Sequence, residues 1–156
     1  MEDRLRLAIL DMNAGRPNQG MRCIRDIAAM YSSAFDIDEF DVRSKNELPD
    51  LSYDVYISSG GPGNPLEGDG VWDKAWYNLV GDLWEYNLAN QFGKKYMFFI
   101  CHSFQMACNF FELGTLAPRK STSFGIMPVH LTKYGENDPI FGSLPDPMYA
   151  VDSRDF

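Results

Sequence analysis

The chain has 156 residues, of which 45% are hydrophobic and 14% aromatic, enough for a folded domain with its own core and too apolar for a disordered segment. Its net charge of −8 combines 22 acidic with 14 scattered basic residues, which excludes a basic stripe for binding nucleic acid or an anionic membrane. No apolar run approaches the ~20 residues of a membrane span and no signal-peptide pattern opens the chain, so we expect a cytoplasmic protein.

The first half of the chain predicts strands that alternate with a helix. Leu5–Asp11 is a nearly continuous apolar run, which is typical of a strand buried on both faces. Turn formers fill residues 12–19, and apolar residues spaced three and four apart over residues 21–31 predict a helix. Alternation over residues 35–42 predicts a strand nearer the sheet edge, and residues 53–58 predict a third strand.

The second half continues the alternation. Large apolar residues spaced along residues 72–83 predict an amphipathic helix, residues 95–101 predict a central strand, and residues 104–111 predict the next helix. Residues 125–132 and 148–151 indicate two further strands. We therefore expect one α/β domain over residues 1–156, a mostly parallel sheet with helices on both faces, where ligands gather at the carboxyl ends of the strands.

Cys101 stands where the predicted strand 95–101 meets the following helix. A side chain in such a tight strand-to-helix turn is presented outward, and the free N–H groups of the helix N-terminus favour a thiolate and can stabilise an oxyanion beside it. Two interpretations stay open at this point: a nucleophile, or a small buried hydrophobic residue. Cys23 and Cys108 fall within helices, and we expect both to be buried structural residues.

A glycine-rich turn, residues 60–63 (Gly-Gly-Pro-Gly), follows the third predicted strand. Glycines allow a backbone to approach a ligand closely, although the same sequence also suits an ordinary strand-ending turn. The turn matches neither a P-loop nor a dinucleotide-binding fingerprint. The three cysteines and two histidines do not have the spacing of a zinc site, so we expect no cofactor and no metal.

In this order, the two turns resemble those of the class I (triad-type) glutamine amidotransferases. Residues 61–63 (Gly-Pro-Gly) correspond to the glycine turn of that family, and residues 99–105 (Phe-Ile-Cys-His-Ser-Phe-Gln) correspond to its Gly-x-Cys-x-Gly-x-Gln elbow. Residues 138–145 also resemble a family segment. The resemblance spans most of the chain and implies a flavodoxin-like fold and hydrolysis of glutamine with release of ammonia.

The resemblance also implies a role for each matching residue. Cys101 would attack the side-chain amide of glutamine and form a thioester, while the backbone N–H groups of Gly61 and His102 would form the oxyanion hole. Gln105 and Gly63 would contact the bound glutamine.

Ser153, in the sequence Asp-Ser-Arg-Asp, corresponds to a Ser-His segment that meets the amino-acid end of the substrate, with Arg154 in place of the histidine. The implied partner is glutamine, and the ammonia would pass to a separate synthetase subunit that accepts it, or the activity would be a stand-alone one. Nucleic acid and membrane are not expected partners.

The sequence departs from the family pattern at several positions. Phe99 and Ser103 replace the elbow glycines, and Phe104 replaces a common histidine. The family's catalytic His-x-Glu motif does not occur within the 156 residues, so we expect a domain that lacks its C-terminal segment. We expect His102 to point into the surroundings of its helix and His130 to be structural.

Three hypotheses follow. The first is a glutamine amidotransferase domain, which as these 156 residues alone would be a poor catalyst because no general base is present. The second is an amidotransferase-like binding or regulatory module without activity. The third is a related cysteine hydrolase that acts on another γ-glutamyl compound.

Overall fold

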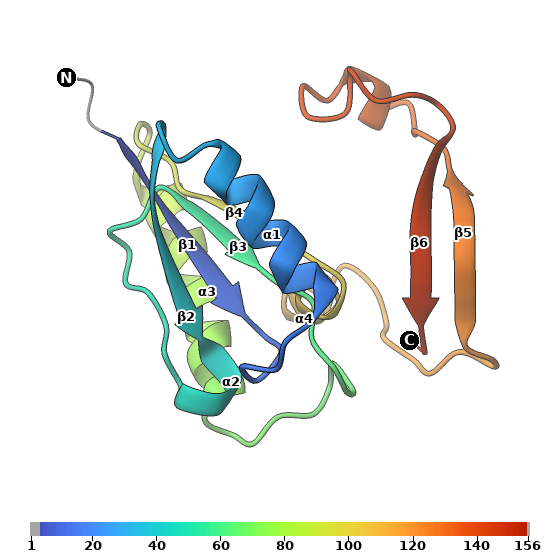
Figure 1. The fold of residues 1–156 in the computed structure, drawn as a ribbon, viewed down its shortest axis with the longest axis horizontal. Coiled ribbons are helices and arrows are strands. Elements are labelled where there is room, and N and C mark those ends of the chain that lie inside the picture. The colour runs from blue at the N-terminus through green and yellow to red at the C-terminus, as the bar shows by residue number, and fades with distance from the viewer. Residues whose placement is uncertain (1–3, 156) are drawn as a thin grey trace. The chain divides into compact units, whose positions relative to one another are not determined.

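The computed structural model describes residues 4–155, and the chain divides into two compact units with the boundary between Thr115 and Leu116 (Figure 1). Among the described residues, no helix combines the length and the apolar character that crossing a bilayer requires.

The first unit alternates strands and helices, as the sequence pattern predicts. Its four strands are all parallel and lie in the order β2-β1-β3-β4. In chain order the elements are β1 (Leu5–Asp11), α1 (Gln19–Met30), β2 (Phe35–Asp41), α2 (Val42–Lys45), β3 (Val55–Ser58), α3 (Trp72–Ala89), β4 (Tyr96–Phe99) and α4 (His102–Phe110). The mostly parallel α/β sheet is therefore confirmed.

Helices cover both faces of this sheet, and alternate residues of β1 explain how. Leu7 and Ile9 pack against α1, whereas Ala8 and Leu10 pack against α3 and α4. All four side chains are buried, so β1 needs apolar residues at consecutive positions rather than at every second one. The continuous apolar run in the sequence has this origin.

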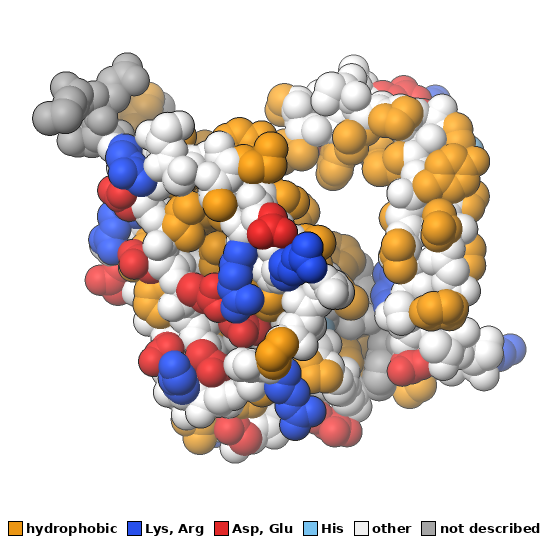
Figure 2. All heavy atoms as spheres, in the orientation of Figure 1, with side chains coloured by type: hydrophobic (Ala, Val, Ile, Leu, Met, Phe, Trp, Pro, Cys, Tyr) orange, Lys and Arg blue, Asp and Glu red, His pale blue; other side chains and the backbone are white. Residues whose placement is uncertain are grey.

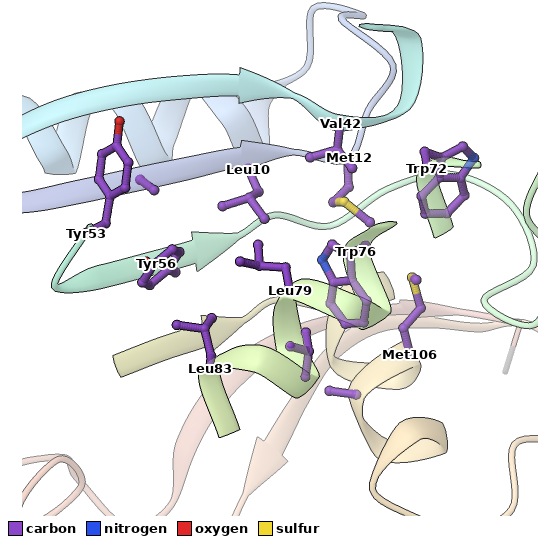
Figure 3. Packing of buried hydrophobic residues seen from close by; sticks show 13 residues of the cluster. Leu10, Met12, Val42, Tyr53, Tyr56, Trp72, Trp76, Leu79, Leu83 and Met106 are labelled. Atoms are coloured by element: carbon purple, nitrogen blue, oxygen red, sulfur yellow. The ribbon is translucent and has the colours of Figure 1, made fainter. Parts of the chain in front are cut away.

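The larger core lies between the sheet and the helices α3 and α4 (Figure 3). Trp76 of α3 is fully buried, and its indole Nε1 donates a hydrogen bond to Ser58 Oγ over 3.0 Å. Because Ser58 is the last residue of β3, this bond fixes the point from which the glycine turn starts. Met106 brings α4 into the same core.

The strand order creates a switch point between β1 and β3. The chain passes from β1 to β2 on one side, and the later strands β3 and β4 add on the other side. In open parallel sheets, ligands bind at such a point, outside the carboxyl ends of the strands. The loop after β1 and the glycine turn after β3 both emerge there.

The expectation that residues 95–101 form a central strand is wrong for the described part of the chain. β4 pairs only with β3 and closes one end of the four-stranded sheet, and its Tyr96 and Phe98 are exposed. Apolar and aromatic residues suit a pleated surface whether or not a neighbouring strand covers them, so the run did not distinguish a central strand from an outer one.

The second unit is an antiparallel hairpin of β5 (Ser123–Val129) and β6 (Met148–Arg154), with a short 3₁₀ turn η1 (Gly135–Asn137) between them. Both predicted strands are confirmed. Ile126 lies opposite Val151, and Pro128 opposite Tyr149, so large apolar side chains share one face of the hairpin. Hydrophobic side chains accordingly line this unit in Figure 2.

Candidate active site

Cys101 occupies a strained turn between β4 and α4. Its φ of 50° and ψ of −103° lie outside the regions that side-chain-bearing residues ordinarily adopt, and its side chain is exposed. The two residues that follow, His102 and Ser103, are buried. The turn therefore presents the thiol outward from a buried base, as a nucleophile elbow does, and the interpretation of Cys101 as a buried hydrophobic residue is wrong.

Ser103 explains one departure from the family's elbow. Its Oγ donates to the carbonyl of Ser58 over 2.7 Å and accepts from the N–H of Ile100 over 3.0 Å. The Ser103 side chain thus ties the end of β3 to the turn that carries Cys101.

Phe99 is the second position at which the sequence differs from the elbow pattern, and its contacts explain that difference. Its ring lies 5.8 Å from that of Trp76, centroid to centroid, and packs against the larger core on the α3 side of β4. The phenyl group therefore fills core space rather than the space around the nucleophile.

The glycine turn lies directly against Cys101. A Cβ atom placed on Gly60 would lie 3.5 Å from the Cβ atom of Cys101. A Cβ atom on Gly61 would lie 2.5 Å from the carbonyl oxygen of Met12, which no side-chain-bearing residue tolerates without a shift. Gly63 has a φ of 91°. The structure thus brings together the two turns that the sequence singled out, and it needs glycine for two different reasons.

His102 is buried below the turn, in the surroundings of its helix, where the sequence analysis placed it. Its side chain is 2% exposed, and Nε2 has no hydrogen-bond partner among the described residues. The pKa of His102 is lowered from 6.5 to about 4. Burial is the largest cause and the nearby cation of Arg43 adds to it, while a hydrogen bond with the backbone of Gly63 partly opposes both. The imidazole is therefore neutral near neutral pH.

This buried histidine is expected to make the fold sensitive to acid. The unfolded chain binds a proton at His102 below about pH 6.5 and the folded chain only near pH 4, so stability is lost as the pH falls through this window. Between pH 7 and pH 5 the loss from this group is about 2 kcal/mol. Urea unfolding at the two pH values measures it. His102→Asn is expected to reduce the difference, and an equal difference in both proteins would contradict the assignment.

The remaining predicted residues divide between the two units. Gln105 is half-buried in the first turn of α4, and its backbone N–H donates to the carbonyl of Cys101 over 3.0 Å. Ser153 is an exposed residue of β6 opposite Phe124, within the second unit. His130 belongs to the second unit as well, where its Nδ1 lies 3.2 Å from Asp146 Oδ1.

Two residues that lie beside the glycine turn were not predicted from the sequence. Asn13 and Arg43 both hydrogen-bond to its backbone. Asn13 stands two residues after the end of the buried strand β1, a position that could have marked it. Arg43 lies in α2, a helix of four residues that carries no periodic signal.

The other two cysteines differ from Cys101 in their surroundings. Cys108 is half-buried, but Cys23 is exposed on α1, so the expectation that it is buried is wrong.

Within residues 4–155, no three side chains of the metal-ligating types come close enough together to hold an ion.

No protein-family model and no curated protein sequence matches the chain. Solved structures do. A glutamine amidotransferase from Thermotoga maritima superposes with a TM-score of 0.73 at 18% sequence identity, over 99% of this chain. The structure of SMU.1228c superposes with a TM-score of 0.66 at 16% identity, over 97% of this chain. The chain spans 62% of the length of each. It therefore has the α/β fold of a glutamine amidotransferase.

Proposed function

We propose that this chain is the nucleophile-bearing part of a class I glutamine amidotransferase domain, which hydrolyses the side-chain amide of glutamine. The observation that carries the proposal is the exposed Cys101, held in a strained strand-to-helix turn in contact with the glycine turn. The shared fold supports it. The two turns supply the groups that acyl transfer requires: a nucleophile and backbone donors beside it.

In the proposed reaction, the Cys101 thiolate forms a C–S bond to the amide carbon of glutamine, and the carbonyl electron pair moves to oxygen. The N–H groups of Gly61 and His102 stabilise this oxyanion. When the tetrahedral species collapses, the C–N bond breaks and the nitrogen leaves with an added proton as ammonia. Water then hydrolyses the thioester to release glutamate and restore the thiol.

Around this centre, Gln105 and Gly63, both in the first unit, hold the glutamine. The ammonia is either transferred to a separate synthetase subunit or released by a stand-alone glutaminase. The proposal requires no metal and no cofactor.

The general base comes from a His-x-Glu segment outside the described residues. Both histidines of the chain have other surroundings: His102 is buried and neutral, and His130 is exposed beside Asp146. A general base contributes ~10²–10⁴-fold, so the 156-residue chain should release ammonia slower than the protein that includes the base by about this factor.

An ammonia-release assay with free glutamine, run on both proteins, measures this difference. Equal rates would contradict the proposed location of the base. Competing γ-glutamyl amides in the same assay distinguish the substrate: preference for free glutamine supports an amidotransferase, whereas preference for another γ-glutamyl compound supports a related hydrolase. An absence of activity in the longer protein supports the non-enzymatic module.

A further inference from the structure

We propose that Asn13 and Arg43 are positioning residues, which clamp the glycine turn of residues 60–63 from two sides and so set the direction of the Gly61 N–H. The inference rests on the proposed function to the extent that this N–H serves an oxyanion. The clamp itself consists of hydrogen bonds between residues of the first unit.

Asn13 controls the peptide group that contains the Gly61 N–H. Its Nδ2 donates to the carbonyl oxygen of Gly60 over 2.8 Å, and Ser59 Oγ donates to the same oxygen over 2.9 Å. In a planar trans peptide, the N–H points opposite to the C=O. Holding the Gly60 carbonyl on one side therefore directs the Gly61 N–H to the other side.

Asn13 is itself held firmly at the end of β1. Its backbone N–H donates to Asp11 Oδ1 over 2.7 Å, and the neighbouring N–H of Met12 donates to Ser59 Oγ over 2.9 Å. Asp11 and Ser59 are both buried. The loop after β1 and the start of the glycine turn thus form one hydrogen-bonded unit at the switch point of the sheet.

Arg43 holds the other side of the turn. Its Nη1 donates to the carbonyl of Pro62 over 2.7 Å and lies 3.3 Å from that of Met12. The guanidinium carbon lies 4.6 Å from the ring centroid of Trp72, at the start of α3. Val42, the residue before Arg43, is fully buried and therefore fixes the backbone position from which the arginine side chain extends.

The two clamps act on different peptide groups of one short turn. Asn13 binds the Gly60 carbonyl and Arg43 binds the Pro62 carbonyl, so a rotation of either peptide breaks a bond to a side chain. Gly61, between them, packs against the Met12 carbonyl and leaves no room for the turn to slide. Loss of one clamp is expected to free the peptide rather than to unfold the domain.

The test compares two reagents at Cys101. A chloroketone analogue of glutamine alkylates the Cys101 thiolate: a C–S bond forms, the C–Cl bond breaks and chloride leaves. Its binding uses the glutamine site. Iodoacetamide reacts with the thiolate without that site. For Asn13→Ala, Asn13→Asp and Arg43→Met, we expect the chloroketone rate, measured by intact mass, to fall about 10–100-fold, because small misplacements near a reacting centre cost this much.

The iodoacetamide rate should stay within about twofold in these variants, since the oxyanion donors do not assist simple alkylation. Arg43→Lys, which keeps a donor and the charge, should recover part of the loss. Asn90→Ala is the matched control, because the half-buried Asn90 also donates from Nδ2 to a backbone carbonyl over 2.8 Å, at the far end of α3. An equal fall with both reagents, or no fall with the chloroketone, would overturn the proposal.

Amide hydrogen exchange keeps the inference testable if the proposed function fails. In Asn13→Ala, the N–H groups of Gly61 and Gly63 should exchange at least about tenfold faster, while those of β1 are unchanged. Unchanged exchange at both glycines would overturn the clamp. A wild-type Cys101 that reacts with iodoacetamide but not with the chloroketone would instead count against the proposed function, and the exchange result would still decide on the clamp.

Discussion

Replacing Cys101 with alanine is expected to abolish the release of ammonia from glutamine, a loss of roughly 10⁴–10⁶-fold in the protein that includes the general base. Without the thiol, no thioester forms, and the oxyanion donors have no tetrahedral species to stabilise. The measurement is a coupled assay for ammonia, with thermal unfolding alongside to show that the fold persists.

The other exposed thiol provides the control for this substitution. Cys23 lies on α1 and is also accessible to solvent, so Cys23→Ala should leave the rate unchanged. Since Cys101 is exposed, its removal leaves no buried cavity, and the melting temperature should change little. Residual activity in Cys101→Ala equal to that of the wild type would exclude the thioester route.

Gly61→Ala is expected to have the second largest effect. The added methyl group would lie 2.5 Å from the Met12 carbonyl oxygen and 3.2 Å from Arg43 Nη1, so the turn must move. Losing one oxyanion donor typically costs ~10²–10³-fold in turnover. Overpacking of the turn should also lower the free energy of unfolding by about 1–3 kcal/mol. Turnover under saturating glutamine and urea unfolding measure the two effects.

Gly114→Ala is the matched control, because a Cβ atom there would meet no other atom within 4 Å. This variant should keep both its turnover and its stability. A Gly61→Ala protein with normal turnover would mean that the glycine turn does not serve the reaction, whatever happens to its stability.

Much of the first unit could be predicted from the sequence, because each element has a periodic pattern of its own. The buried run of β1 and the apolar spacing of α1 and α3 depend on contacts that every residue of the element makes in the same way. The helix α2 has four residues and no such pattern, and it forms because Asp41 caps it and Asn46 ends it in the left-handed region.

The site was predictable to the same extent. Cys101 and the glycine turn are visible because the backbone there needs particular residue types. The contacts made by Asn13 and Arg43 join segments 47 and 19 positions away along the chain, and nothing in local spacing indicates which of many asparagines and arginines will reach a turn. Phe99 did not look compatible with an elbow until the direction of its ring was known.

The most direct measurement of the central claim is the capture of the chloroketone analogue of glutamine, followed by peptide mapping. We expect a single adduct on Cys101, formed more slowly when free glutamine is added, because glutamine occupies the site that the reagent must enter. An adduct on Cys23 or Cys108 instead, or a reaction at Cys101 that glutamine does not slow, would contradict the assignment of Cys101 as the nucleophile of a glutamine site.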